Sequence, residues 1–199
     1  MTGGFGERGT QGKINAIRYA RENGIPILGI CYGLHMMVIE AARNLLGLPR
    51  ANSTEIAPDS PDPVIHIMDS QKDIANKGGT MRLGAWPCAI KPGSIALSLY
   101  RKSNISERHR HRYEVNNDYR ERLADVGLVA TGLSPDDRLV EIMELKGHPW
   151  FLGCQFHPEL KSRPLDPHPL FRGLIKAAVA RRTTAQPKHS KVRALRSVS

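Results

Sequence analysis

The sequence has few cysteines and few aromatic residues, and it lacks a long apolar run. Only Cys31, Cys88 and Cys154 are cysteines among 199 residues, and no two of them form a Cys-x-x-Cys pair. This count argues against a disulfide framework and a cysteine-based zinc site. No apolar stretch approaches the roughly 18 residues that a membrane-spanning helix needs. The first residues do not resemble a secretory signal either, so we expect a cytoplasmic protein with no membrane partner.

Acidic residues are missing from the C-terminal end. Residues 181–199 contain six of the 29 Lys and Arg residues and none of the 19 acidic ones, so much of the net charge of +10 resides there. The segment is also rich in Ser and Thr without apolar periodicity, which predicts a disordered basic tail. Such a tail could bind nucleic acid by charge alone, but a solvated tail is the simpler interpretation. We therefore expect one domain over residues 1–180 and a tail over 181–199.

The pattern of the first 180 residues predicts an α/β domain, because a helix, an apolar strand and a second helix are followed by several strands and a closing helix. Thr10 is the expected N-cap of the first helix. Helices are predicted at 11–23, 34–45, 119–126 and 169–181. Strands or extended segments are predicted at 25–30, 64–68, 80–90, 107–115, 128–131, 139–145 and 150–156, and 49–76 reads mainly as loop.

Cys31 is the candidate nucleophile. It lies in Gly29-Ile30-Cys31-Tyr32-Gly33, between the first apolar strand and the second helix. This is the Gly-x-nucleophile-x-Gly pattern, in which two glycines permit a sharp turn that lifts one side chain above the sheet edge. The N-terminus of a helix also favours a thiolate, and the N–H of Tyr32 is a natural oxyanion donor. Taken alone, the pattern also fits a small buried core cysteine.

His157 and Glu159 are the candidate partners of Cys31. They follow the strand at 150–156 within Gln155-Phe156-His157-Pro158-Glu159. A thiol nucleophile needs a base, and the base needs an acceptor that orients it. Because both residues come just after a strand end, we expect them to reach Cys31 and form a Cys-His-Glu triad.

The elbow and the Phe-His-Pro-Glu segment together resemble the class I glutamine amidotransferases. Within these, longer stretches resemble the glutaminase domain at the C-terminus of the CTP synthase family, from Gly3 to about Ala180. The stretches are Gly3–Gly6 with Arg8–Thr10, Ala51–Glu55, Gly78–Gly84, Glu107–Asn117, Cys154–Arg163 and Pro167–Gly173. The resemblance implies a flavodoxin-like, mostly parallel sheet flanked by helices. It also implies an N-terminally truncated domain whose first strands are missing.

The resemblance implies that the chain hydrolyses L-glutamine through a thioester and supplies ammonia to a synthetase domain, which aminates UTP to CTP. That synthetase, with its ATP and Mg²⁺, is absent from this sequence, and no cofactor or metal is implied for the chain itself. The family assembles as tetramers. Matching residues are Cys31, His157 and Glu159 for catalysis, Gly4 and Tyr32 for the oxyanion, and Gly4, Tyr32, Gly33, Leu34, His35, Glu55 and Arg112 for glutamine. A zwitterionic ligand needs both a carboxylate and a guanidinium, which Glu55 and Arg112 would supply.

Two residues beside Cys31 depart from the family pattern. Tyr32 and His35 stand where the family usually has Leu and Gln, and the family's Gln contacts substrate. Tyr32 places a bulky ring near the nucleophile. His35 could lower the pKa of Cys31 if its imidazole were charged.

The sequence is also compatible with other functions. A truncated or split subunit could bind a synthetase partner without catalysis. The run Arg108–Arg112 could bind a metal through its His-x-His pair or could bind nucleic acid, but two ligands are few for a metal, and only Tyr113 offers an aromatic surface.

Overall fold

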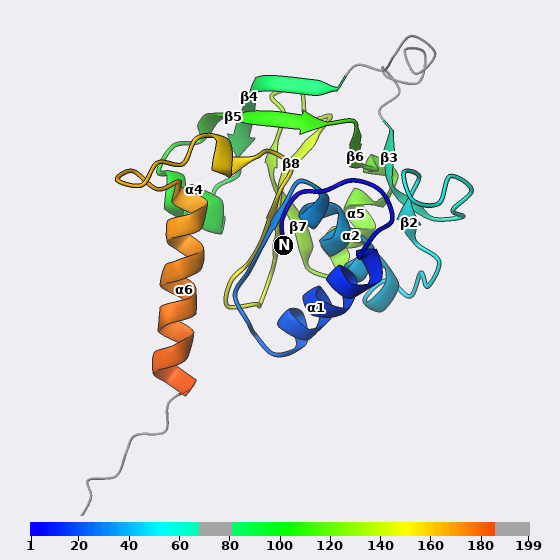
Figure 1. Cartoon of the computed structure of the whole chain (residues 1–199), viewed down its shortest axis with the longest axis horizontal. Helices are drawn as coiled ribbons and strands as arrows, with labels where there is room; N and C mark the ends of the chain where they lie inside the picture. Colours follow the sequence, from blue (N-terminus) through cyan, green and yellow to red (C-terminus); the bar gives the residue numbers. More distant parts are fainter. Residues whose placement is uncertain (68–80, 186–199) are drawn as a thin grey trace, which may run out of the picture.

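The computed structural model describes residues 1–67 and 81–185. The expected Gly78–Thr80 part of one family motif, and the predicted tail beyond residue 185, lie outside the described residues. Figure 1 shows two sheets with helices around them. In chain order the helices are α1 (Thr10–Glu22), α2 (Tyr32–Asn44), α4 (Ile95–Tyr100), α5 (Arg120–Asp125) and α6 (Pro169–Ala185), with short 3-10 turns η2 (Asn117–Tyr119) and η3 (Pro158–Leu160).

The larger sheet has six strands in the order β1-β9-β8-β7-β4-β5. Their bounds are β1 Ile27–Ile30, β4 Arg82–Ile90, β5 Asn104–His111, β7 Leu128–Leu133, β8 Val140–Leu145 and β9 Phe151–Cys154. The expected α/β fold is confirmed, but within the described residues only the β1–β9 pair of this sheet is parallel. The other pairs are antiparallel. β7, β8 and β9 follow one another through short turns, which suit antiparallel neighbours, whereas β4 pairs with β5 across helix α4 and with the more distant β7.

A second sheet of three short strands lies beside the first, in the order β2 (Asn52–Ser53), β3 (Pro63–Ile67) and β6 (Tyr113–Val115). β3 runs antiparallel to β6, with Ile65 opposite Val115. Since β6 follows β5 after a single residue, Arg112 is placed at the junction of the two sheets.

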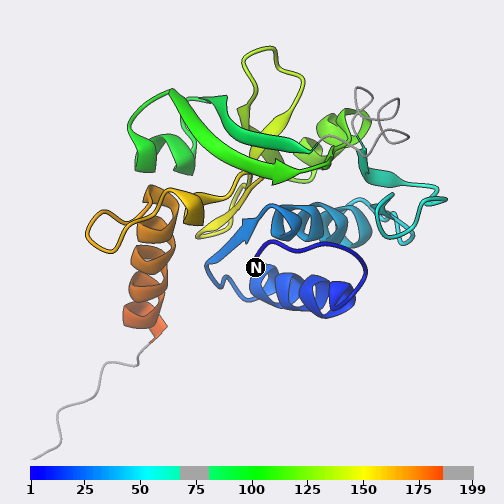
Figure 2. The same cartoon turned by 45° about the horizontal axis from the view of Figure 1, so that its top comes forward.

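Helix α1 packs against α2, and Figure 2 shows the two helices side by side. One apolar stripe of α1, formed by Ile14, Ile17 and Ala20, is buried against the core. Arg21 of α1 also donates to the buried carboxylate of Glu40 in α2, with 2.8 Å between Nη2 and Oε1. Thr10 is not the N-cap of α1, because Gly9 occupies that position and the Thr10 hydroxyl donates instead to the Glu7 carbonyl.

Helix α4 did not emerge from the sequence pattern. Ser94 caps its first turn by accepting from Leu97 N. The buried carboxylate of Glu144, on β8, accepts from the N–H groups of Ile95 and Ala96 at 2.8 and 2.9 Å. Helix α6 extends away from the rest of the chain (Figure 1) and runs past the predicted end at residue 181.

The parallel pair β1–β9 determines where the candidate residues meet. Ile30, the last residue of β1, lies opposite Cys154, the last residue of β9. Cys31 N then donates to Cys154 O at 2.7 Å. Residues that follow the two strands therefore emerge at the same sheet edge.

The turn after β1 depends on two glycines that touch each other. A Cβ added to Gly29 would lie 2.8 Å from the carbonyl carbon of Gly33 and 2.6 Å from Met37 Sδ. Contacts below 3 Å are not accommodated without movement of the backbone, so this turn requires Gly at position 29.

We expect Gly29→Ala to lower the free energy of unfolding by about 1–3 kcal/mol, the usual range for an overpacked site. Urea denaturation monitored by circular dichroism measures this free energy. The matched control is Gly12→Ala, since Gly12 is exposed within α1 and a Cβ there meets nothing within 4 Å. That control should be more stable than the wild type by up to about 1 kcal/mol, because Ala has a higher helix propensity than Gly. Equal stability of the two variants would contradict the close-packing explanation.

Candidate active site

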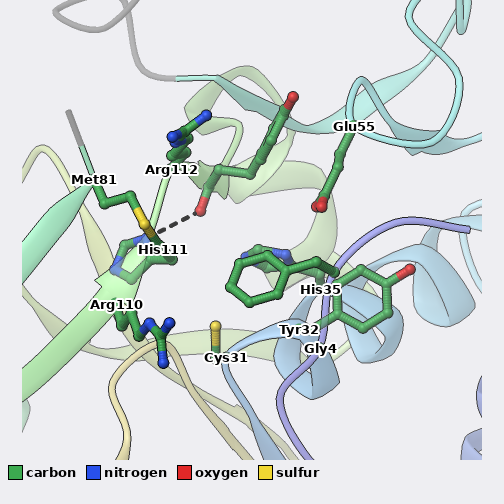
Figure 3. A pocket seen from close by; sticks show the side chains of 11 residues that line it. Gly4, Cys31, Tyr32, His35, Glu55, Met81, Arg110, His111 and Arg112 are labelled. Atoms are coloured by element: carbon green, nitrogen blue, oxygen red, sulfur yellow. Dashed lines mark hydrogen bonds between the residues drawn. The ribbon is translucent and has the colours of Figure 1, made fainter. Parts of the chain in front are cut away.

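Cys31 occupies a strained turn between β1 and α2. Its backbone has φ 51° and ψ −106°, a region that residues with a side chain seldom adopt. The thiol is buried, with 2% exposure, and it reaches the cavity shown in Figure 3. The sharp turn expected from the sequence is therefore present, and it directs the thiol at the sheet edge.

His157 and Glu159 form a hydrogen-bonded pair just beyond β9. Nδ1 of His157 lies 2.6 Å from Oε1 of Glu159. The His157 backbone is fixed as well, because its N–H donates to Arg108 O at 2.8 Å. Within the described part of the chain, Nε2 of His157 is buried and has no hydrogen-bond partner. This nitrogen is available to exchange a proton.

Gly3 lies close to both Cys31 and His157. A Cβ at Gly3 would lie 3.1 Å from His157 Cε1 and 3.9 Å from Cys31 Cβ. The N-terminal loop therefore passes beside both Cys31 and His157, and this position favours a residue without a side chain. The structure brings together the three residues that the sequence predicts as a triad.

The surroundings of Cys31 favour the neutral thiol in the free protein. Burial raises the pKa of Cys31 to about 12, and the Tyr32 N–H opposes this rise. Three carboxylates, Glu114, Glu159 and Glu55, raise the pKa further. At neutral pH the thiol therefore keeps its proton until a base removes it. The pKa values of Cys88 and Cys154 are also raised by burial, but neither residue lines this cavity.

A cavity of about 410 Å³ opens above Cys31. Six residues that the sequence analysis assigned to the site line it: Gly4, Cys31, Tyr32, His35, Glu55 and Arg112. Gly33, Leu34, His157 and Glu159 are not among the lining residues, and Leu34 turns into the core, where it packs against Gly153. Five further lining residues were missed: Phe5, Met81, Arg110, His111 and Tyr113. Arg110 and His111 belong to the run Arg108–Arg112. Their position next to Arg112 in the sequence was the signal that could have identified them.

Charges of both signs face this cavity. Figure 3 shows the Glu55 carboxylate on one side and the Arg112 and Arg110 side chains on the other. In the free protein Oε1 of Glu55 accepts from Gly6 N at 2.9 Å. The arrangement can hold a small ligand that carries both an ammonium and a carboxylate.

Tyr32 does not place its ring over the nucleophile. Its hydroxyl donates to Gly6 O and lies 3.0 Å from the Thr10 hydroxyl. Figure 3 shows this hydroxyl pointing away from Cys31. Tyr32 therefore anchors the loop formed by residues 3–6 and leaves the space above the thiol open.

His35 is neutral in this setting. Burial lowers its pKa to about 4, although hydrogen bonds to Gln155 and the Tyr113 carbonyl act in the opposite direction. Because a histidine is charged only below its pKa, His35 carries no charge at neutral pH. The expectation that an imidazolium at this position lowers the pKa of Cys31 is therefore not supported. Nε2 of His35 instead lies 2.9 Å from Gln155 Oε1.

The two histidines of the His-x-His pair contact each other. Nδ1 of His109 lies 2.9 Å from Nε2 of His111, and Nε2 of His109 lies 3.3 Å from a Glu141 oxygen. Among residues 1–67 and 81–185, no group of three or more His, Cys, Asp or Glu side chains is arranged to hold a metal ion. None of the helices in these ranges has the length and hydropathy needed to span a membrane.

Comparison with known proteins connects this geometry to a family. The model of the family "Glutamine amidotransferase class-I" matches residues 1–177. The chain is 63% identical over 179 residues to a CTP synthase of Symbiobacterium thermophilum and 60% identical to one of Aquifex aeolicus. Each match covers 90% of this chain and about a third of the relative, 33% and 34%.

Solved structures show the same relationship. The glutaminase domain of a Trypanosoma brucei CTPS, with acivicin bound, superposes with a TM-score of 0.84 at 40% identity, covering 89% of this chain and 69% of that one. A GMP synthase-like protein of Thermoplasma acidophilum superposes with a TM-score of 0.57 at 18% identity, covering 87% of this chain and 68% of that one, which shows the shared fold alone. The chain therefore belongs to the class I glutamine amidotransferases, and within them to the glutaminase domains of CTP synthases.

Proposed function

We propose that this chain hydrolyses L-glutamine through a thioester on Cys31. The observation that carries the proposal is the convergence of Cys31 and His157 beside Gly3, with Nε2 of His157 buried and unpartnered among the described residues. A thiol that must lose a proton thus lies near a base that has room for one. The related glutaminase domain, solved with acivicin bound, supports a ligand-binding role for this domain.

The placement of these groups supports the following reaction. His157 Nε2 takes the proton of the Cys31 thiol, and Sγ attacks the carboxamide carbon of glutamine. The backbone N–H groups of Gly4 and Tyr32 stabilise the resulting oxyanion. His157 returns the proton to the leaving nitrogen, ammonia departs, and water then hydrolyses the thioester to glutamate. Glu159 holds the imidazole through Nδ1 during both steps.

Glu55 and Arg112 bind the end of glutamine that does not react. Both line the cavity above Cys31. The carboxylate of Glu55 binds the α-ammonium, and the guanidinium of Arg112 binds the α-carboxylate. No cofactor takes part in this half-reaction, because the thiol and the imidazole supply its nucleophile and its acid and base.

The released ammonia is the nitrogen donor for a synthetase partner, which uses ATP and Mg²⁺ to aminate UTP to CTP. This part of the proposal rests on the CTP synthase relatives, of which the chain spans about a third. Assembly into a tetramer belongs to the same proposal, as does action in the cytoplasm. The complete set of catalytic groups around Cys31 favours this function over a non-catalytic module that only binds a synthetase.

Cys31→Ala should abolish glutamate release from glutamine, because neither of the other two thiols faces the cavity. A coupled glutamate dehydrogenase assay with the purified chain measures the release, with and without an added synthetase partner. The matched control is Cys88→Ala, which removes a thiol of similar burial away from the cavity and should keep the wild-type rate. Release that persists in Cys31→Ala, with the fold intact, would refute the proposed function.

Glu55→Gln should raise KM for glutamine and lower kcat/KM by about tenfold or more, since a hydrogen bond to a charged group contributes about 1.5–3 kcal/mol. The turnover number should change less, because the contact is made to a non-reacting part of the substrate. Steady-state kinetics of the variant measure both constants. Glu121→Gln, at an exposed position in α5, is the control and should match the wild type. An unchanged KM in Glu55→Gln would remove Glu55 from the substrate site.

A further inference from the structure

Gln155 connects Cys31 to His35. It is fully buried just beyond β9, and its backbone N–H donates to Glu141 O at 2.8 Å. Its side-chain oxygen lies 2.9 Å from His35 Nε2, and its side-chain nitrogen donates to Cys31 Sγ at 3.9 Å. Neither end of this amide faces solvent, so both contacts are made in the protein interior.

The contact with His35 matches the orientation of the Gln155 amide. Nε2 of His35 makes a close contact to Gln155 Oε1, and the Tyr113 carbonyl also lies near the ring. Because Oε1 can only accept, this contact requires the proton of the neutral ring on Nε2. Because an amide has one acceptor end and one donor end, its N–H₂ group is left facing Cys31.

We propose that Gln155 is a further catalytic residue, whose side-chain N–H stabilises the thiolate of Cys31, and that His35 is the positioning residue that holds Gln155 in this orientation. The inference rests on the proposed thioester mechanism, in which Cys31 becomes an anion. A charge-assisted hydrogen bond to sulfur is stronger than one to the neutral thiol. Gln155 therefore favours the form that attacks.

The charges around Cys31 explain the need for such a donor. Carboxylates of Glu55, Glu114 and Glu159 disfavour the thiolate, as does burial, and the Tyr32 N–H favours it. Other titratable or charged groups near the thiol are His157 beside Gly3, the buried Cys154, the neutral His35, and the cavity residues Tyr32, Arg110, His111, Arg112 and Tyr113. Gln155 adds a donor without a net charge, so it supports the anion without competing with His157 for the proton.

The rate at which iodoacetamide alkylates Cys31 reports the thiolate directly. We expect Gln155→Met to lower this rate about tenfold across neutral to alkaline pH, and to shift the pH profile upward, because a hydrogen bond to a charged group is lost. Met keeps the length and burial of Gln without the donor. Gln11→Met, at an exposed position of α1, is the matched control, and Cys31→Ala gives the background from Cys88 and Cys154. A pH profile in Gln155→Met equal to that of the wild type would overturn the role of Gln155.

Two variants at position 35 test the positioning role while leaving Gln155 in place. His35→Leu should lower the alkylation rate as Gln155→Met does, whereas His35→Gln should restore it, since a Gln side chain reaches as far as Nε2 of His. Equal rates in His35→Leu and the wild type would refute the role of His35. This pair also decides the inference if Gln155→Met does not fold, as judged by near-ultraviolet circular dichroism.

The alkylation readout uses no glutamine, so it separates the two proposals. Lower alkylation in Gln155→Met together with no glutamine hydrolysis by the wild type would refute the proposed function and leave the thiolate contact standing. Unchanged alkylation together with active hydrolysis would refute the role of Gln155 alone.

Discussion

The parallel pairing of β1 with β9 is the constraint on which the site depends. Four residues of each strand pair in register, and the strands end at Ile30 and Cys154. Parallel neighbours end at the same sheet edge, so Cys31, Gln155 and His157 meet although more than 120 residues separate Cys31 from the other two. The contact between Gly29 and Gly33 then turns the chain tightly enough to begin α2 at once. A change in register of one residue would send these side chains to opposite faces.

A buried cluster of ionisable side chains lies behind His111, which lines the cavity. Arg82 Nη2 lies 2.6 Å from Glu141 Oε1, and its Nη1 lies 3.5 Å from Glu114. His109 and His111 lie beside these carboxylates. Because side chains alternate along β5, burial of the histidines directs Arg108 and Arg110 to the opposite face. Buried ion pairs of this kind add little net stability, so we interpret the cluster as fixing the β5–β6 bend that presents Arg112.

Local sequence patterns were sufficient for the elbow, the His-Glu pair and most helices, since these depend on near neighbours in the chain. Features that depend on distant residues were not predictable. Helix α4 is completed by Glu144 on β8, about 50 residues away, and the antiparallel pairing of β4 with β7 joins strands that are far apart in the chain. The anchoring role of Tyr32 requires Thr10 and the Gly6 carbonyl to lie beside its hydroxyl. Gln155 was read as part of a motif, but its role requires the position of His35.

The hydrogen bond between Gly6 and Glu55 has a mechanical consequence for an empty site. The loop that carries Gly4 is tethered to the carboxylate that would receive an incoming ammonium. An arriving amine must share that carboxylate with the loop or displace the loop from it. In the proposed reaction the loop would therefore link the two ends of the cavity, because it carries Gly4 and is held by Glu55. A ligand that has a carboxamide but no amine would leave the tether in its resting state, so the loop itself would discriminate glutamine from simpler amides.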